Sequence, residues 1–273
     1  MNDESLAPLT PPPAGLPSVG DLLRSSLERY KEHWKLWVAI VLPAALVGGL
    51  YAYLMPTPAP GLPAEPVDAP GMILLSLVLA IVQFVSTLAL LTAVREPVSV
   101  GEAYRRGAKF LFPYLFVGIL SGIIIGGGFL LFIIPGVLFA LWFGLAPYIL
   151  ISENTRGMDA LLKSKAYVSG HVLSVLGRVL VLLLVAIVAS AVLSILPEPV
   201  PTVLITFFLV PFATIYCFKI YEGLRAIKGT VPDTYPTREK ALYLVIGLLG
   251  IIVFVGLIAF GVAAFFLNLP RPM

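Results

Sequence analysis

The sequence is poor in the residues that build metal sites and disulfides, and it is poor in charge. Its 273 residues include one cysteine and two histidines. The single cysteine, Cys217, excludes an internal disulfide and a cysteine-based zinc cage. Only 12% of the residues are charged, about half of the share that is usual in a soluble domain. We therefore expect no metal, no cofactor and no enzymatic activity.

Long hydrophobic runs take the place of the missing charge. The sequence is 59% hydrophobic, with a mean hydropathy of +0.99, and its runs approach the roughly 20 residues that cross a bilayer as a helix. This pattern predicts an all-α, polytopic transmembrane bundle of six to seven spans. The predicted spans are residues 36–55, 71–94, 111–132, 136–152, 179–196, 200–218 and 241–267. They form one transmembrane domain, residues 18–273, after a Pro-rich segment, residues 1–17, that we expect to be a disordered cytoplasmic tail.

The distribution of Lys and Arg predicts the orientation of these spans, because basic residues are retained on the cytoplasmic side. Of the 18 basic residues, all but Arg271 fall on one side of the predicted spans. The N-terminus is then cytoplasmic, the C-terminus lies outside, and the protein is a multi-pass protein of a bacterial inner membrane. The net charge of +3 follows from this topology, so we expect no nucleic acid partner.

Prolines interrupt several of the apolar runs. In a bilayer, neighbouring helices can repair the hydrogen bonds that a proline removes, so Pro43, Pro147 and Pro211 are interpreted as kinks within spans one, four and six. Pro135 and Gly136 are interpreted as the turn between spans three and four, with the proline at the first helical position. A turn at residues 126–128, which are three glycines, is the alternative.

A weak internal repeat precedes three pairs of spans. "SVGDLLRSSLERY" begins at Ser18 and "SVGEAYRRGAKF" begins at Ser99, and each opens with the Ser-x-x-Asp/Glu pattern of a capping box, in which hydroxyl and carboxylate satisfy free amides at a helix start. A third segment, "GMDALLKSKAYVSGH", keeps the later part of the pattern. The aligned positions are Asp21, Glu102 and Asp159, followed by the small residues Ser26, Gly107 and Ser164. We predict three short amphipathic helices, each followed by a two-span hairpin.

These three helices are expected to lie in the interface between headgroups and water, because each has an apolar face and a basic face. They could instead be short cytoplasmic extensions of the spans. Glu102–Arg106 and Asp159–Lys163 are predicted ion pairs four residues apart. The residues expected to contact anionic lipid headgroups or a protein partner are Arg24, Lys31, Arg105, Arg106, Lys109, Lys163 and Lys165.

The stretch "IPGVLFALWFGLAPYILISENTRGMDALLKSKAYVSGH" resembles the glycerophosphoryl diester phosphodiesterase membrane-domain-like family and related bacterial polytopic membrane proteins. The residues that carry this resemblance are Ile134, Pro135, Gly136, Pro147, Glu153, Ala160, Leu161, Ser164 and Gly170. In some members the membrane domain resembles an anchor that is fused to a separate catalytic domain with a His-Arg-Gly stretch. The present sequence has no such stretch, so the resemblance implies the membrane domain without the phosphodiesterase activity.

Two features of the spans are candidates for packing and function. Gly118, Gly122 and Gly126 repeat at four-residue steps in span three, a spacing that lets helices approach closely. Packing inside the bundle is one interpretation, and homodimerisation is the other. Glu153, at the end of span four, is interpreted as a gate or partner site at the inner mouth, or as a carboxylate that caps the helix end.

Together these features favour a non-enzymatic membrane protein that acts as a scaffold, an anchor or a lipid-organising factor. Its partners would be the phospholipid bilayer and anionic headgroups, with a protein partner or a second copy as further possibilities. The alternative is a transporter or channel for a lipid-like or small solute, in which the proline-kinked spans supply the moving elements.

Overall fold

The computed structural model describes residues 15–54 and 69–267, with side chains as far as residue 260, and every regular element in these ranges is a helix. Seven helical segments are long and apolar enough to cross a membrane. Their helices are α2 (Trp34–Leu54), α3 (Ala69–Arg95), α5 (Leu111–Leu131), α6 (Ile133–Phe143) with α7 (Ala146–Glu153), α9 (Val172–Leu193), α10 (Val200–Leu204) with η1 (Ile205–Leu209) and α11 (Val210–Lys228), and α12 (Thr237–Leu267). The predicted fold class is confirmed. The predicted tail lies outside the described residues, apart from residues 15–17.

The predicted spans agree with the helices to within a few residues, except at two ends. Span five begins at Val172 rather than at residue 179, so the helix runs through Arg178. This is possible because the Arg178 guanidinium donates to the carbonyl oxygens of Leu16 and Pro17, at 3.1 and 2.6 Å. Span six continues to Lys228, beyond the predicted end at residue 218.

The three predicted short helices are present as α1 (Val19–Glu32), α4 (Val100–Ala108) and α8 (Gly157–Val168). The hydroxyl oxygens of Ser18 and Ser99 accept hydrogen bonds from the backbone amides of Asp21 and Glu102. The carboxylate half of the predicted box differs, because Asp21 accepts from the Ser18 hydroxyl at 2.6 Å and not from its amide. These caps fix where α1 and α4 begin.

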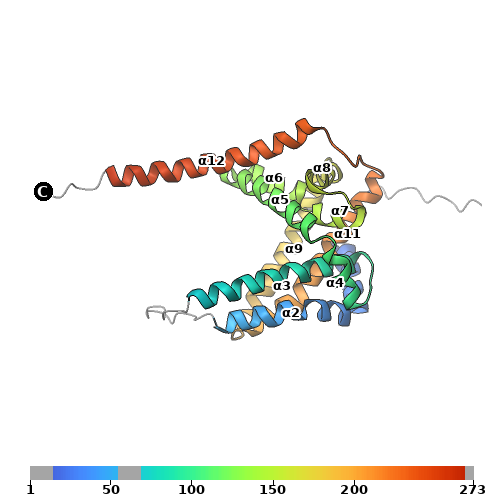
Figure 1. Ribbon diagram of the computed structural model, residues 1–273. Coiled ribbons are helices and arrows are strands. Elements are labelled where there is room, and N and C mark those ends of the chain that lie inside the picture. The colour runs from blue at the N-terminus through green and yellow to red at the C-terminus, as the bar shows by residue number, and fades with distance from the viewer. Residues whose placement is uncertain (1–14, 55–68, 268–273) are drawn as a thin grey trace, which may run out of the picture.

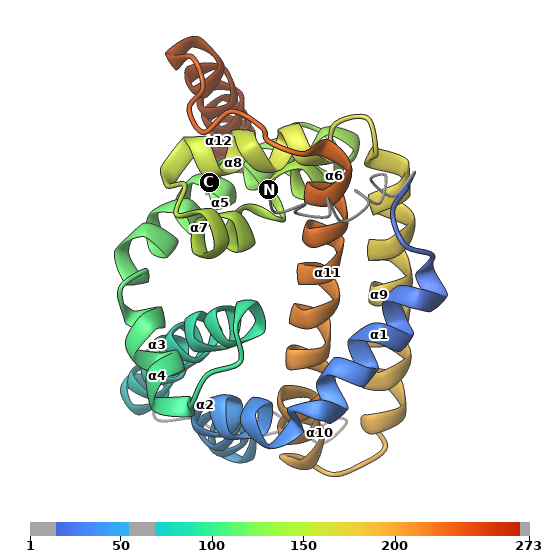
Figure 2. The same cartoon turned by 90° about the vertical axis from the view of Figure 1, so that its right-hand side faces the viewer.

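The repeat builds a ring of three units, each made of one short helix and two spans (Figure 2). Helix α4 packs on α3, which is the second span of the preceding unit, and α8 packs on α6 and α7 in the same way. Helix α1 packs on α11, the second span of the third unit, and so closes the ring. The three aligned small residues are all buried at these contacts: Ser26, Gly107 and Ser164.

Close packing explains why the aligned positions are small. A Cβ atom on Gly107 would lie 3.0 Å from the backbone nitrogen of Ala89 in α3. The Ser164 hydroxyl donates to the carbonyl oxygen of Trp142 at 2.6 Å and accepts from the amide of Leu145 at 3.2 Å. It thereby satisfies backbone groups that the break between α6 and α7 leaves free.

Two of the three predicted proline kinks coincide with breaks in a span. Pro147 lies in the first turn of α7, directly after the break at residues 144–145. Pro211 lies in the first turn of α11, directly after the π-helical segment η1. Pro43 lies inside α2, which runs without a break in its helical assignment.

The turn between α5 and α6 lies at Phe132, whose backbone is extended (φ −158°, ψ 152°). Both predicted positions for this turn are therefore wrong. Pro135 lies in the first turn of α6, and Gly136 is a packing residue, because its Cβ would come within 2.4 Å of the Phe129 ring. Gly128 is buried in the same way against the ring of Phe139. Gly128 and Gly136, two of the glycines that suggest a turn, serve the contact between α5 and α6 instead.

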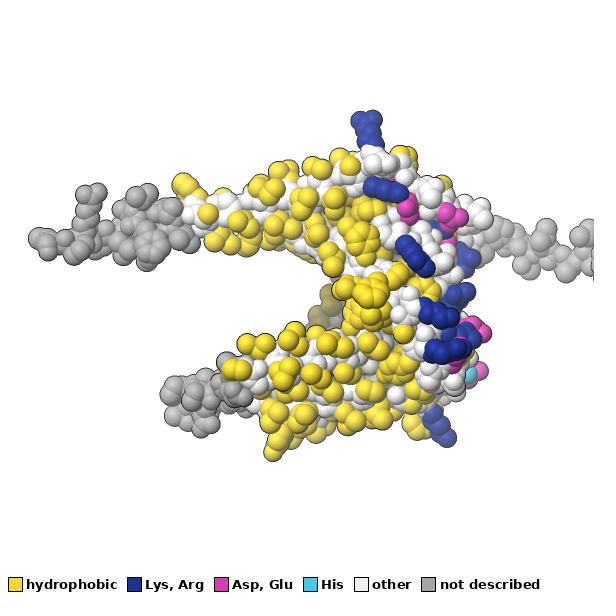
Figure 3. Space-filling model, in the orientation of Figure 1, with side chains coloured by type: hydrophobic (Ala, Val, Ile, Leu, Met, Phe, Trp, Pro, Cys, Tyr) yellow, Lys and Arg dark blue, Asp and Glu magenta, His cyan; other side chains and the backbone are white. Residues whose placement is uncertain are grey.

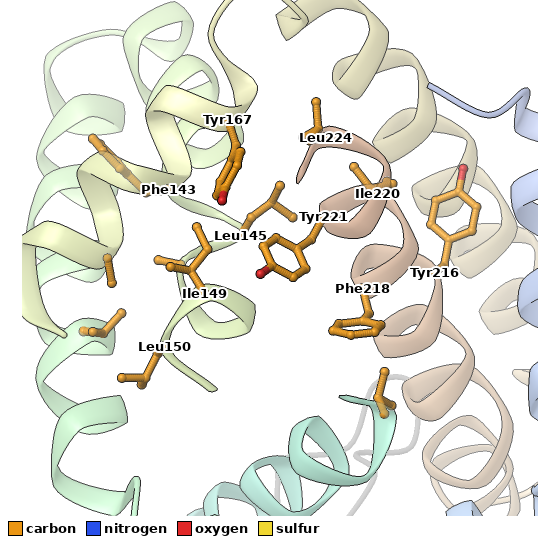
Figure 4. Close-up of a cluster of buried hydrophobic side chains, with 14 of the residues drawn as sticks. Phe143, Leu145, Ile149, Leu150, Tyr167, Tyr216, Phe218, Ile220, Tyr221 and Leu224 are labelled. Carbon is orange, nitrogen blue, oxygen red and sulfur yellow. The ribbon is translucent and has the colours of Figure 1, made fainter. Parts of the chain in front are cut away.

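Charged side chains gather at one end of the molecule, which we name the charged end; it contains α4, α8 and the α11–α12 linker, residues 229–236 (Figure 3). A core of buried aromatic and aliphatic side chains from α6, α7, α8 and α11 lies just inside this end (Figure 4). Away from it the helices separate into two arms, one made of α2 and α3 and the other of α5, α6 and α12 (Figure 1). The space-filling view shows a deep cleft with apolar walls between the arms.

The two arms meet at the base of this cleft. The rings of Phe84 in α3 and Tyr114 in α5 are 5.1 Å apart. Below them, towards the charged end, Leu88 and Leu91 of α3 form a small buried cluster with Ile151 of α7. In the described part of the chain, these contacts anchor α3 to the second unit through the half of the helix nearer the charged end.

Candidate functional site

The carboxylate of Glu153 joins three helices at the charged end. Tyr167 of α8 and Tyr221 of α11 both donate to its Oε1 atom, at 3.0 and 2.6 Å. The ammonium of Lys163 in α8 lies 2.5 Å from Oε2, and the Arg225 guanidinium approaches Oε1 to 3.9 Å. Glu153 stands at this point because α7 ends there with Asn154 in the left-handed conformation (φ 54°).

This ion pair is buried. The side chain of Glu153 is 10% exposed and that of Lys163 is 4% exposed. Burial lowers the pKa of Lys163, but hydrogen bonds to Asp233 and Glu153 outweigh it and raise the pKa above its ordinary value. Burial and the bond to Glu153 also raise the pKa of Tyr167. At neutral pH the lysine is therefore charged and the tyrosine is a neutral donor.

The linker between α11 and α12 is tied to the same helix, α8. Asp233 in the linker pairs with Lys163. The carboxylate of Asp159 accepts from the backbone amide of Tyr235 at 2.9 Å and from the Lys240 ammonium at 2.7 Å. The predicted Asp159–Lys163 pair is wrong, since each residue turns to a partner far away in the sequence.

Two of the predicted headgroup contacts are engaged within the protein. Lys163 is buried and paired, so the predicted contact with lipid is wrong for this residue. Lys165 lies over the rings of Tyr243 and Trp142, 4.9 and 5.5 Å from their centres, and so links α8 to α12 and α6. Such cation–π contacts favour a fixed side chain.

A pocket of about 360 Å³ lies beside the buried pair, lined by Glu153, Lys163, Tyr167, Arg225, Asp233 and residues 229–231. Its cations and carboxylates are paired with one another. In the part of the chain that the structure describes, no three His, Cys, Asp or Glu side chains gather to hold a metal ion. The arrangement is that of a structural lock, in which α7, α8, α11 and the linker share one ion-pair network.

A second polar cluster lies at the junction of α3, α4, α5 and α7. Glu102 accepts from Arg105 and from Arg106, at 2.7 and 2.6 Å, so the predicted Glu102–Arg106 pair is confirmed. These hydrogen bonds lower the pKa of Glu102 to about 2. Arg106 also bonds Glu96 at 2.9 Å. Glu96, Glu102 and Arg106 line a pocket of about 230 Å³ together with Arg95 and Lys109.

The remaining predicted basic contacts lie on α1. Arg24 is exposed and pairs with Glu28 at 3.0 Å, and Lys31 is exposed. Both side chains remain available at the surface of the charged end, so the prediction that they contact lipid headgroups stands as a prediction.

The prediction that the glycines of span three pack inside the bundle is wrong, and the homodimer alternative stays a prediction. A Cβ atom on Gly118, Gly122 or Gly126 would meet no atom within 4 Å among the described residues. The close helix contact lies on the other side of α5, where a Cβ on Gly127 would come 2.0 Å from the carbonyl oxygen of Gly247 in α12. The signal for this contact is the short Gly-x-x-Gly spacing in α12, residues 247–250, which the sequence interpretation missed.

The described residues form seven apolar helical spans, and the charged side chains gather at one end of them. These features define a multi-pass membrane protein. The chain is distantly homologous to a bacterial protein of this class, a UPF0259 membrane protein of Pectobacterium carotovorum subsp. carotovorum (strain PC1), with 30% identity over 131 residues. The match covers 46% of this chain and 52% of the relative, so the chain spans about half the length of the curated relative it matches. No family model and no solved structure matches the chain. The likeness to phosphodiesterase membrane domains therefore stays a prediction.

Proposed function

We propose that the protein is a non-enzymatic, lipid-organising scaffold of a bacterial inner membrane, with its charged end in the cytoplasm. The observation that carries this proposal is the apolar cleft between the α2–α3 arm and the α5–α6–α12 arm (Figure 3). In a bilayer such a cleft is filled by acyl chains, because neither water nor unpaired polar groups are stable against hydrocarbon walls. The scaffold would hold those chains in a fixed place beside the charged end.

The faces of the two helices at the cleft follow from their contact at its base. Leu77 and Ile81 lie seven and three residues before Phe84, so they continue the face of α3 that meets α5. They are 56% and 64% exposed. Gly118 and Gly122 follow Tyr114 at four-residue steps and continue its side of α5. Large apolar side chains on α3 thus oppose a glycine surface on α5.

This pairing supports occupation by lipid rather than by another helix of the chain. The glycine surface leaves space beside α5, and the opposing leucine and isoleucine offer only dispersion and apolar contact. Among the described residues, no buried acid lines the cleft to serve ion or proton coupling, since the charged network lies at one end.

Lipid photo-crosslinking tests the proposal. The protein is reconstituted with a phospholipid that carries a diazirine in the middle of one acyl chain, and crosslinked peptides are mapped by mass spectrometry. We expect crosslinks on α3 around Leu77 and Ile81 and on α5 around Gly122. Chains held in the cleft should be retained during detergent exchange longer than chains crosslinked to Leu184 of α9, which is 60% exposed on an outer helix.

Substitution of Gly122 by Leu provides the matched variant, because it adds a side chain to the cleft without touching the charged end. Its crosslinks at Leu77 should fall, while those at Leu184 should stay. Equal retention at both positions in the wild-type protein would contradict a lipid-organising role for the cleft.

Breaks in two spans favour a second function, transport of a lipid-like or small solute. Span four is interrupted at residues 144–145, and span six contains the π-helical segment η1. Such interruptions occur often at functional or moving sites. Water-soluble maleimide reaching a cysteine at position 77 from both sides of the membrane, in a Cys217→Ala background, would favour transport over the scaffold.

A further inference from the structure

The polar pocket of about 230 Å³ at the charged end lies directly below the base of the cleft. Two of its lining residues, Phe110 and Ile151, also belong to the apolar cluster around Leu88 and Leu91 that joins the arms. The pocket therefore adjoins the apolar cluster that forms the base of the cleft. A polar pocket against an apolar cleft matches an amphiphile, with its headgroup in one and its chains in the other.

The charges of the pocket favour an anion. Three cations line it, Arg95, Arg106 and Lys109, against two carboxylates, Glu96 and Glu102. Both carboxylates are already bonded to arginine, at 2.6 to 2.9 Å. One positive charge remains uncompensated by the carboxylates that line the pocket.

Arg95 and Lys109 are the cations that can serve a ligand. One nitrogen of Arg95 donates to the carbonyl oxygen of Ile151 at 2.8 Å, which fixes the guanidinium beside the pocket and leaves its other N–H groups. Among the described residues, none accepts a hydrogen bond or forms an ion pair with the Lys109 ammonium. Lysine binds phosphate as a point charge, and arginine binds it through paired N–H groups.

The depth of Lys109 also fits a phosphate. It directly follows the polar helix α4, and only Phe110 separates it from the start of the apolar helix α5. Basic residues at such a boundary lie at the level of lipid phosphates. A volume of about 230 Å³ is several times the roughly 30 Å³ share of a single water molecule, so a phosphate and part of a headgroup fit.

We propose that this pocket binds the phosphodiester of one anionic phospholipid, with Lys109 and Arg95 as its ligands, while the acyl chains of that lipid enter the cleft between α3 and α5. The assignment rests on the proposed lipid-organising function and names the lipid class and the headgroup site that belong to it. The single negative charge of a phospholipid such as phosphatidylglycerol compensates the one unmatched positive charge of the pocket.

Native mass spectrometry of the full chain, titrated with dioleoylphosphatidylglycerol, tests this site. The wild-type protein should retain one lipid preferentially. Lys109→Gln should weaken that binding about tenfold, the effect of losing one charge-assisted hydrogen bond, and Lys109→Arg should keep it. Lys228→Gln is the matched control, because Lys228 is an exposed cation at the end of α11 that does not line the pocket and is not among the predicted headgroup contacts.

Two results would overturn the proposal. One is equal loss of lipid in Lys109→Gln and Lys228→Gln, which would indicate a diffuse charge effect. The other is displacement of the lipid by millimolar inorganic phosphate, which would indicate a site for free phosphate. Arg95→Gln gives an independent second test and should lower lipid binding as Lys109→Gln does.

Acyl-chain crosslinking of the same variants separates this assignment from the proposed function. If Lys109→Gln leaves phosphatidylglycerol binding unchanged while chains still crosslink at Leu77, the headgroup site is wrong and the lipid cleft stands. If crosslinks at Leu77 are absent from the wild-type protein, the proposed function itself fails.

Discussion

The same helices form both ends of the cleft, but they are in contact at one end and separated at the other. Near the charged end α3 touches the second unit through Phe84 and Tyr114 and through the cluster around Ile151. Towards the other end α3 and α5 part, and their facing surfaces are exposed (Figure 3). The charged end is held together by specific ion pairs and hydrogen bonds, whereas the exposed apolar walls of the open end need only hydrocarbon beside them.

Helix α5 carries this difference on its own surface. Gly127 and Gly128 face α12 and α6 so closely that no Cβ would fit, and Gly118 and Gly122 face open space. In a membrane, helices gain little by burying apolar surface, because lipid chains are equally apolar. Close packing and polar contacts therefore decide which surfaces join, and a glycine surface without a partner can stay open to lipid.

The largest effect should follow from breaking the lock at the charged end. Lys163→Met leaves Glu153 buried without its cation, and losing one partner of a buried pair costs about 3 kcal/mol or more. We expect a marked drop in the midpoint of thermal unfolding in detergent. Asp233→Asn is the control, since Asp233 is 79% exposed and such pairs contribute about 1 kcal/mol at most.

The double variant Glu153→Gln with Lys163→Met sharpens this test. If the two residues act as a pair, the double variant should be less destabilised than the sum of the single variants. Additive losses of stability would contradict the claim that Glu153 and Lys163 stabilise the charged end as a coupled pair.

A second prediction contrasts neighbouring glycines on the two sides of α5. Gly127→Ala forces α5 away from the Gly247 backbone of α12 and should cost about 3 kcal/mol. Gly126→Ala places its methyl group in open space and should raise stability by about 0.5 kcal/mol, as alanine replaces glycine in a helix. Unfolding by a graded denaturing detergent compares the two. Equal losses would mean that the open face is packed after all.

A third prediction concerns the open face alone. Gly122→Leu should change the free energy of unfolding by no more than about 0.5 kcal/mol, as for a substitution away from packed contacts. It should nevertheless reduce acyl-chain crosslinking at Leu77, because the new side chain occupies the space of the lipid. Loss of stability without loss of crosslinking would mean that the Gly122 face of α5 packs against protein and does not contact lipid.

The smallest effect concerns pH and the pairs of Glu102. Its pKa is lowered from 4.5 to about 2 by Arg105 and Arg106. A lowered pKa means that the folded state favours the ionised form, so this stabilisation is present above pH 4.5 and is lost as the pH falls towards 2. Glu102→Gln should therefore remove part of the pH dependence in that window, measured by thermal unfolding. An unchanged profile would show that the pairs contribute nothing to folding.

The membrane spans could be read from the sequence because each depends on its own residues alone. Runs of apolar residues, basic residues at their ends and capping serines such as Ser18 and Ser99 are local signals. The threefold repeat was also visible, and its small residue at Gly107 has a physical reason in the contact with α3. Even so, the turn at Phe132 escaped, because no residue there departs from the apolar pattern around it.

The candidate site depends on contacts between distant residues and could be predicted only in part. Glu153 stood out because a carboxylate ends an apolar run. Its partners Tyr221 and Arg225 lie 68 and 72 positions away, and nothing local marks them. Lys163 looked like an exposed interfacial lysine for the same reason. Glycine spacing marked Gly118 and Gly122 as surfaces for close approach, but spacing does not say whether a helix or a lipid approaches.

Spin-label accessibility at positions 77 and 122, in a Cys217→Ala background and in a lipid bilayer, tests the central claim most directly. If lipid chains fill the cleft, labels at both positions should collide freely with molecular oxygen and rarely with a water-soluble nickel complex, as a label at Leu184 on the outer surface of α9 should. Frequent collisions with the nickel complex would mean a water-filled pathway. Protection from both reagents would mean closed protein packing, and either result would contradict the account.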